Sequence, residues 1–232
     1  MKTQLSPQRN PRRQKKTRRI RIFPILLGIL AIAAIFVGLR LHAKNQNRLW
    51  DPVSRSEIQA ALEENESLSP DVQTVVDSAV SLVGKVHYFW GGKSASVGWD
   101  DRWGTLTEVT SEGSSTTGTK RPFGLDCSGF VTWCFLQTGY SWDEAVELVG
   151  NGTYNQWALS REIGWEELRP GDFAFQHEPN DPEGNHIGIC IGLDASGEPL
   201  FAHCAAGENN VVVTHADDVF RYARRPNVFC ES

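Results

Sequence analysis

The residues best suited to chemistry are one cysteine and two histidines that follow it in the chain. Cys127 lies between Asp126 and Ser128 and directly precedes an apolar run, which predicts that it begins a helix. At a helix N-terminus the macrodipole and the unpaired N–H groups favour a thiolate, and the same N–H groups can hold an oxyanion. His186 and His203 follow in short apolar runs typical of strands. Nucleophile, base and orienting residue in this order indicate a cysteine hydrolase.

Five motifs in a fixed order extend this reading. They are Tyr88–Gly92 (YFWGG), Leu125–Phe130 (LDCSGF), Leu168–Phe173 (LRPGDF) and the segments around His186 and His203. Between about Val72 and Val228 the chain resembles the NlpC/p60 family of bacterial cell-wall cysteine peptidases. A bare Asp-Cys-Ser-Gly is a weak signal, but five motifs in the family's order are specific. The resemblance implies a papain-like α+β fold whose nucleophile helix packs on a small antiparallel sheet.

The resemblance also implies roles for the motif residues. Cys127 would be the nucleophile, His186 the general acid–base and His203 the residue that orients His186. The implied substrate-binding residues are Tyr88 beside the nucleophile, Trp90 as a pocket wall, and Asp126 and Ser128 at the amino end of a stem peptide. This chemistry needs no metal and no organic cofactor. Activity is expected to fall below the ordinary histidine pKa of about 6.5.

Each of these residues also has a plainer interpretation. Cys127 can be a buried structural cysteine, because free cysteines are among the most buried residues. His203 can be a packed core histidine, and Asp126 can be an ordinary helix cap. The position of Cys127 at a predicted helix start, among small and polar neighbours, favours the nucleophile.

The substrate implied by the resemblance is peptidoglycan, cut at an amide bond of its stem peptides through a Cys127 thioester. The expected bond joins γ-D-glutamate to the diamino acid. Four alternatives share the fold: an amidase acting between muramic acid and L-alanine, a cross-bridge endopeptidase, an acyltransferase, and a non-catalytic module that binds the cell wall.

Charge is divided unevenly along the chain. Residues 1–48 hold twelve lysines and arginines and no acidic residue. The rest of the chain holds the other eleven basic residues and all 28 acidic residues, a formal charge of −17. A segment this acidic is not expected to bind nucleic acid.

The basic part of the chain contains a candidate membrane span. Residues 22–39 carry no charge and are near the lower length limit for one crossing. Nine basic residues precede them, which places residues 1–21 in the cytoplasm as a tail and the chain from about residue 42 outside. We therefore expect a transmembrane anchor over residues 22–41 in the cell membrane. Secretion after cleavage of a signal peptide is the alternative.

The remaining chain divides into a stalk or linker at 42–69, with a possible short helix at 54–66, and a peptidase domain at 70–232. Residues 93–124 interrupt that domain between the first two motifs. A loop of this length is usually functional or disordered. Because it contains two tryptophans and leads to the nucleophile, we expect a lid that shapes substrate binding. A plain surface loop is the alternative.

Hydrophobic periodicity predicts the elements that position the motifs. Helices are expected from residue 70 to about 83, from Cys127 to about 138, at 142–149 and at 153–160. Strands are expected at 172–175, 187–193, 200–203 and 210–214. Helices followed by a run of antiparallel strands indicate an α+β fold. On this plan Cys134 and Cys190 are core residues.

Overall fold

The computed structural model describes residues 51–65, 68–181, 184–217 and 219–230. The predicted cytoplasmic tail and membrane anchor lie outside these residues. Within the described ranges, no helix has the length and apolar character needed to cross a membrane.

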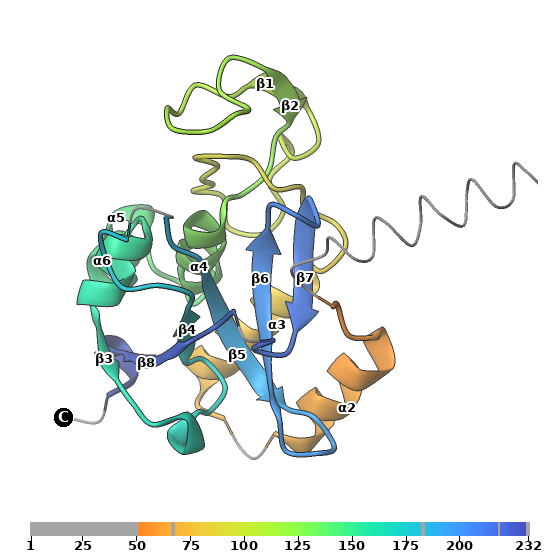
Figure 1. Ribbon diagram of the computed structural model, residues 1–232, viewed down its shortest axis with the longest axis vertical. Coiled ribbons are helices and arrows are strands. Elements are labelled where there is room, and N and C mark those ends of the chain that lie inside the picture. The colour runs from red at the N-terminus through yellow and green to blue at the C-terminus, as the bar shows by residue number, and fades with distance from the viewer. Residues whose placement is uncertain (1–50, 66–67, 182–183, 218, 231–232) are drawn as a thin grey trace, which may run out of the picture. The chain divides into compact units, whose positions relative to one another are not determined.

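A six-stranded antiparallel sheet forms the centre of the fold, in the order β3-β8-β4-β5-β6-β7 (Figure 1). The strands are β3 (Ser160–Glu162), β4 (Phe173–Phe175), β5 (Ile187–Leu193), β6 (Pro199–Ala205), β7 (Asn210–Thr214) and β8 (Tyr222–Pro226). Strands β4 to β7 match the prediction, because their apolar side chains are buried on both faces. The prediction missed β3 and β8.

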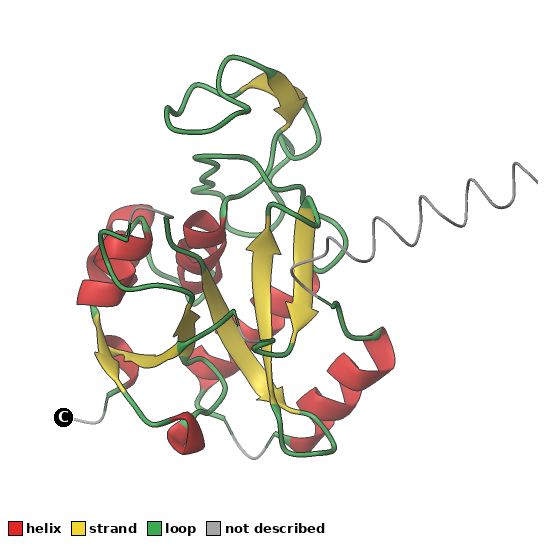
Figure 2. Cartoon of the chain, viewed as in Figure 1, coloured by secondary structure: helices red, strands yellow, loops and turns green. Residues whose placement is uncertain are grey.

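Helices cover this sheet (Figure 2). They are α2 (Arg55–Glu64), α3 (Pro70–Ser81), α4 (Cys127–Leu136), α5 (Trp142–Val149) and α6 (Thr153–Ala158), with 3-10 turns at Trp165–Glu167 and Asn227–Phe229. Every residue of α4 is buried, between α3 and α5 on the helix side and β5 and β6 on the sheet side. This confirms a mixed fold in which the helix beginning at Cys127 packs on an antiparallel sheet.

Part of the predicted stalk belongs to the packed body. Ser54 caps α2 in a capping box with Glu57, as the sequence pattern at 54–66 suggests. Ile58 and Ala61 on this helix are buried in the core, and α2 packs on β5. The Asn65 side chain then donates to the carbonyl of Ile191 at 3.0 Å. Residues 55–64 are therefore a helix of the core rather than a linker.

The arginines of β8 explain why that strand was missed. Arg225 is 7% exposed and donates to both carboxylate oxygens of Asp172, at 2.9 and 2.8 Å. Arg224 lies over the Trp157 ring, 4.2 Å from its centroid. Buried charge of this kind is retained only where it is paired and hydrogen-bonded. Asp172 ends the Leu-x-Pro-Gly-Asp motif, so this pair ties the motif to the sheet.

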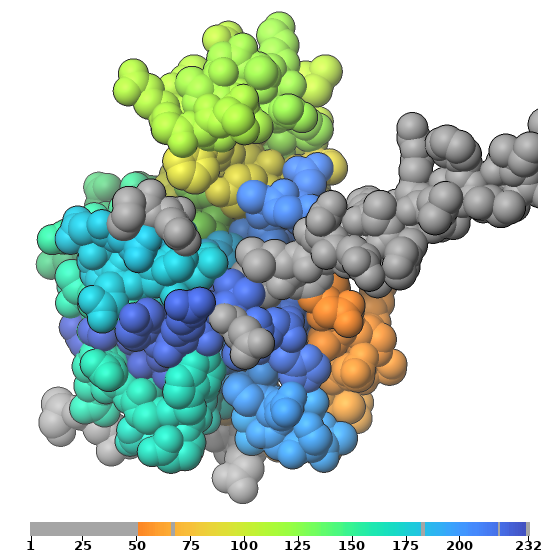
Figure 3. All heavy atoms as spheres, viewed as in Figure 1, coloured from red at the N-terminus to blue at the C-terminus, as the bar shows by residue number. Residues whose placement is uncertain are grey.

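The insertion at 93–124 is built as a structured lobe. It contains a hairpin of β1 (Leu106–Glu108) and β2 (Lys120–Pro122), and its residues project beyond the main body in the space-filling view (Figure 3). Its base is anchored: Trp103 is buried and packs edge-to-face on Trp133 of α4 at 5.4 Å. The Trp133 ring nitrogen donates to the Ser96 carbonyl at 2.9 Å.

Five cysteines are present as free thiols. Cys134 and Cys190 are fully buried, which confirms the prediction that they are core residues. Cys204 is also fully buried, and Cys230 is partly exposed.

Candidate active site

Cys127 is the first residue of α4, as the sequence predicts. Asp126 caps this helix, since its Oδ1 accepts the Gly129 N–H at 2.6 Å. The segment before the helix pairs with the Tyr88–Gly92 motif: Phe89 N–H donates to the Leu125 carbonyl at 2.9 Å. Cys127 is therefore fixed from both sides, by the cap and by this pairing.

Glycines allow the two motifs to approach so closely. A Cβ on Gly124 would lie 1.9 Å from the carbonyl oxygen of His87, and one on Gly92 would lie 2.3 Å from the Gly124 carbonyl. No side chain fits at either position. Gly92 of the first motif and Gly124 of the segment before Cys127 therefore serve one purpose, which is the close approach of two backbone segments.

His186 and His203 lie in hydrogen-bond contact, as predicted for a base and its orienting residue. His186 Nε2 is 2.9 Å from His203 Nδ1, and His203 Nε2 is 3.1 Å from the Thr214 hydroxyl. His186 immediately precedes β5, His203 lies on β6 and Thr214 ends β7. Phe220 stacks on the His186 ring with a centroid distance of 5.7 Å and an interplanar angle of 15°.

The hydrogen bonds assign the tautomers. The Thr214 hydroxyl donates to the His215 carbonyl at 2.7 Å, so it can only accept from His203 Nε2–H. His203 Nδ1 is then an acceptor, and His186 must donate its Nε2–H to it. This row of bonds favours the tautomer in which neutral His186 carries its proton on Nε2.

The backbone N–H groups of Ile187 and Ser128 act on the Cys127 thiol and lower its pKa. Ile187 directly follows His186 in the chain, so the start of β5 lies near Cys127. Burial nevertheless raises the pKa of the Cys127 thiol to about 12, and the Asp126 carboxylate adds to that rise. The expected preference for a thiolate is therefore not met in the resting state, because desolvation outweighs the helix N-terminus.

Burial acts on the histidines in the opposite direction. It lowers the pKa of His186 to about 4 and places the pKa of His203 well below its ordinary value. Both rings are thus neutral at physiological pH, and the resting site contains a neutral thiol and two neutral imidazoles.

This lowered pKa changes the expected pH dependence. A base that titrates near 4 still accepts a proton at pH 5, where a histidine of pKa about 6.5 would be roughly 97% protonated. We expect kcat/KM at pH 5 to stay within about twofold of its value at pH 7, rather than falling about 25-fold. A profile of kcat/KM from pH 4 to 8 decides between the two.

The control for that profile is stability. Neutral buried His186 and His203 leave the unfolded chain with more bound protons below about pH 6.5, so stability falls as the pH falls through that range. Circular dichroism at each pH therefore accompanies the rates. An acid limb near 6.5 in protein that is still folded would contradict the lowered pKa of His186.

Tyr88 lies near Cys127. Its backbone forms an isolated β-bridge with Leu125. Burial raises the pKa of Tyr88 far above its ordinary value, so its hydroxyl stays protonated. The neighbouring groups of Cys127, Asp126 and Cys204 each raise the pKa of this hydroxyl further. No hydrogen bond joins that hydroxyl to another described residue. Tyr88 is therefore placed to donate to an incoming carbonyl.

The side chains of Asp126 and Ser128, which were predicted to contact substrate, both bind the ammonium of a lysine. Lys93 Nζ is 2.7 Å from Asp126 Oδ1 and 2.6 Å from Ser128 Oγ. The Ser128 hydroxyl donates to Asp126 Oδ1 at 2.8 Å. A substrate amine that binds here must therefore displace the Lys93 ammonium.

Trp90, predicted as a pocket wall, is 37% exposed and is held by the insertion. Its ring N–H donates to the Glu112 carbonyl at 2.8 Å. The neighbouring Gly91 has φ +75°, and a Cβ there would collide with the Ser111 side chain. The first motif and the insertion thus form one continuous surface.

Several site residues were missed by sequence reasoning. Thr214, Lys93 and Phe220 contact the predicted residues directly. The Gln156 side chain donates to the Ser128 carbonyl at 2.8 Å and so supports the first turn of α4. Among these residues, only Lys93 has a signal in the sequence, because it directly follows the Gly-Gly pair of the first motif.

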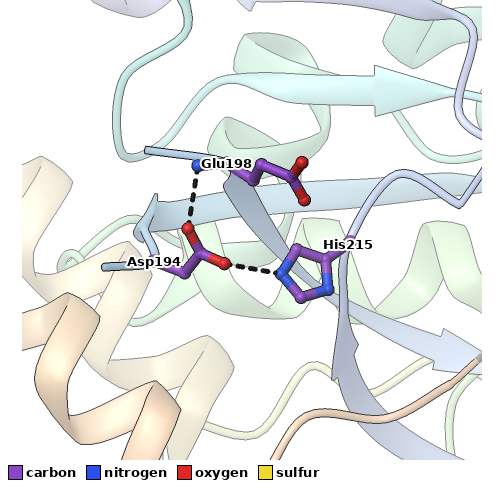
Figure 4. A group of neighbouring side chains, drawn as sticks. All are labelled: Asp194, Glu198 and His215. Atoms are coloured by element: carbon purple, nitrogen blue, oxygen red, sulfur yellow. Dashed lines mark hydrogen bonds and ion pairs between the residues drawn. The ribbon is translucent and has the colours of Figure 1, made fainter. Parts of the chain in front are cut away.

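A second polar cluster lies at the turns beside β5, β6 and β7 (Figure 4). Asp194 Oδ2 is 2.9 Å from His215 Nε2, and Asp194 Oδ1 accepts the N–H groups of Ser196 and Glu198. Both carboxylate oxygens are thus used within the protein. His215 and these turn groups hold the pKa of Asp194 well below its ordinary range. The cluster therefore holds His215, whose carbonyl accepts the hydrogen bond of the Thr214 hydroxyl.

The chain belongs to the NlpC/P60 family, whose model matches residues 84–223. The matched range contains Tyr88, Cys127, His186 and His203. None of the curated proteins compared with the chain matches it.

Solved structures similar to this chain belong to the same family. The peptidoglycan hydrolase RipB of Mycobacterium tuberculosis is 19% identical, with 75% of this chain and 68% of that chain covered and a TM-score of 0.47. The P60 domain of antigen MAP1204 from M. avium subspecies paratuberculosis is 17% identical over 69% and 96%, with a TM-score of 0.47. RipD of M. tuberculosis, a non-catalytic NlpC/p60 protein adapted to peptidoglycan binding, is 17% identical over 68% and 98%, with a TM-score of 0.44.

Proposed function

We propose that this protein is a peptidoglycan hydrolase, a cysteine endopeptidase that cuts an amide bond of the stem peptide. The observation that carries the proposal is the hydrogen-bonded row of Thr214, His203 and His186. His186 directly precedes Ile187, whose backbone N–H acts on the Cys127 thiol. The row orients a neutral imidazole, which is the state of His186 that can accept a proton. Family membership supports peptidoglycan as the substrate.

The proposed reaction has two halves. The Cys127 thiol gives its proton to His186 while sulfur attacks the amide carbonyl carbon, and the Tyr88 hydroxyl donates to the developing oxyanion. His186 then passes the proton to the leaving nitrogen, the C–N bond breaks and a thioester remains. Water attacks the thioester, gives one proton to His186, and sulfur leaves as the restored thiol.

The bond we propose joins γ-D-glutamate to the diamino acid. The test is to incubate purified protein with intact peptidoglycan and with defined stem peptides, and to weigh the products by mass spectrometry. Cleavage after glutamate supports the proposal. Release of the whole stem from muramic acid would make the protein an amidase, and cleavage within cross-bridges would make it a cross-bridge endopeptidase. Transfer to an added amine would make it an acyltransferase, and binding without any product would leave a wall-binding module.

We further propose that the N-terminal segment anchors the protein in the cell membrane and that the catalytic domain faces outward. The uncharged stretch at 22–39, preceded by nine basic residues, supports this topology. Alkaline extraction of cell membranes tests it. Anchored protein stays in the membrane pellet, whereas full-length protein in the wash or a shortened form in the medium would contradict the anchor.

We propose that the insertion is a fixed wall of the substrate cleft. The base of the insertion must stay in any test, because Trp103 packs on α4. The hairpin tip can be removed by joining Thr107 to Arg121, which lie opposite each other, through an Asn-Gly turn. We expect this variant to keep its urea midpoint but to change the ratio of kcat/KM values between short stems and cross-linked wall. An unchanged ratio on every substrate would contradict the wall.

A further inference from the structure

Lys93 places a positive charge beside the nucleophile. Its ammonium contacts the residues on both sides of Cys127, 2.7 Å from Asp126 Oδ1 and 2.6 Å from Ser128 Oγ. The same Asp126 oxygen accepts the Ser128 hydroxyl at 2.8 Å and the Gly129 N–H at 2.6 Å. The carboxylate that caps α4 is thus also the counter-ion of a lysine.

The position of this lysine is built into the fold. A Cβ on Gly129 would lie 2.9 Å from Lys93 Cδ and 2.1 Å from the Gly92 carbonyl oxygen, so the alkyl stem passes directly over the first turn of α4. The Lys93 side chain is 26% exposed and the Asp126 side chain 13%. An ion pair this enclosed is less weakened by solvent than one on an open surface.

Asp126 alone would hinder the chemistry. A carboxylate next to a sulfur that becomes anionic opposes the change, while a nearby ammonium favours it. Both effects act on Cys127, where Asp126 raises the thiol pKa and Lys93 lowers it. Because Asp126 is the N-cap of α4, its negative charge is fixed beside Cys127, where it disfavours a thiolate.

We propose that Lys93 is a positioning residue that neutralises the Asp126 cap, so that the Cys127 sulfur can carry negative charge during attack. His186 remains the base in this scheme. Two further ionisable groups, Tyr88 and Cys204, feel the charge of Cys127, and burial raises the pKa of both so that they stay neutral. Lys93 is therefore the positive charge that acts on this sulfur among the described residues.

The proposal rests on Cys127 being the nucleophile, but its test needs no substrate. The second-order rate of alkylation by iodoacetamide reports the fraction of thiolate at a fixed pH. The full chain carries a Cys230→Ser background substitution, because Cys230 is partly exposed, and the Cys127 peptide is quantified by mass spectrometry. Failure of this test leaves the hydrolase proposal standing, and absence of hydrolysis leaves this test valid.

Four variants make the test specific. Lys93→Met should slow alkylation of Cys127 about tenfold, equivalent to one pKa unit, and Lys93→Arg should stay near the parent rate. Asp126→Asn, which still caps a helix, should speed alkylation. Combining Lys93→Met with Asp126→Asn removes both charges, so its rate should return toward that of the parent.

Lys85→Met is the matched control, because the Lys85 ammonium bonds the Ser81 carbonyl outside the site. It should alkylate at the parent rate. An unchanged rate in Lys93→Met would overturn the proposal. So would a double variant as slow as Lys93→Met, because that result would show that Lys93 acts only by holding structure. If Lys93→Met does not fold, Lys93→Gln takes its place, because it removes the charge but keeps a polar group for Asp126 and Ser128, and the same slowing is expected.

Discussion

Replacing Cys127 with alanine is expected to abolish turnover and to leave the fold intact. The substitution removes the only atom that can form the thioester, and loss of a nucleophile of this kind costs roughly 10⁴-fold or more in kcat. Cys127 is the first residue of α4, where alanine is compatible with the helix, and the Asp126 cap and the backbone pairing of Leu125 do not involve its side chain. Product formation from stem peptides measures the loss.

Cys134→Ala is the matched control for this variant. Cys134 lies two turns further along the same helix and is fully buried. Its removal leaves a small cavity and should lower the free energy of unfolding by about 1 kcal/mol without changing kcat. Urea unfolding of both variants separates folding from chemistry. Hydrolysis by Cys127→Ala at the parent rate would remove the nucleophile from the mechanism.

Replacing His186 with alanine is expected to be almost as severe, because it removes both the proton acceptor for sulfur and the proton donor for the leaving nitrogen. Nucleophile and base act as a unit, so the double variant with Cys127→Ala should be no slower than either single variant. His87→Ala is the control, since the His87 side chain bonds Asn209 and is partly exposed. Retention of more than a tenth of kcat in His186→Ala would contradict its role as base.

Thr214→Val provides a graded version of the same prediction. It keeps the shape of the side chain but removes the acceptor for His203 Nε2–H, so His203 can adopt the other tautomer and no longer fixes His186. We expect a fall in kcat of about tenfold, equivalent to about 1.4 kcal/mol, which lies within the cost of an unpaired buried donor. A similar fall should follow His203→Ala. An unchanged kcat in Thr214→Val would show that the tautomer is held by other contacts.

Much of the site could be read from the sequence because its parts are local. The position of Cys127 is indicated by the N-cap residue before it, the small residue after it and the apolar helix that follows. The strand that follows His186 and the strand that carries His203 are short runs of buried apolar residues. These patterns depend on neighbours in the chain, so one sequence is enough to recognise them.

The site residues that were not predicted depend on contacts between segments that lie far apart in the sequence. Lys93 meets Asp126 across 33 positions and an intervening insertion. Thr214 reaches His203 only because β6 and β7 pair with His203 opposite Val212, which puts Thr214 on the diagonal. Its residue type, at the end of a valine-rich strand, predicts nothing more than a strand.

Two arginines explain why β8 was not predicted from the sequence. A small number of apolar residues explains why the helix α2 was assigned to a linker. Arg224 and Arg225 suggest an exposed loop, whereas Trp157 and Asp172 allow them to be buried in the sheet. The short helix α2 has few apolar residues, yet Ile58 and Ala61 are enough to dock it on β5. Tertiary partners, which composition does not reveal, decide both cases.

The most direct test of Cys127 as nucleophile is the mass of the intact protein after mixing with a stem peptide and quenching with acid. We expect a fraction of the protein to gain the mass of the acyl fragment, located on the Cys127 peptide, and we expect no such gain in Cys127→Ala. Rapid hydrolysis by the parent protein with no adduct at any quench time, together with undiminished hydrolysis by Cys127→Ala, would contradict a thioester mechanism at this site.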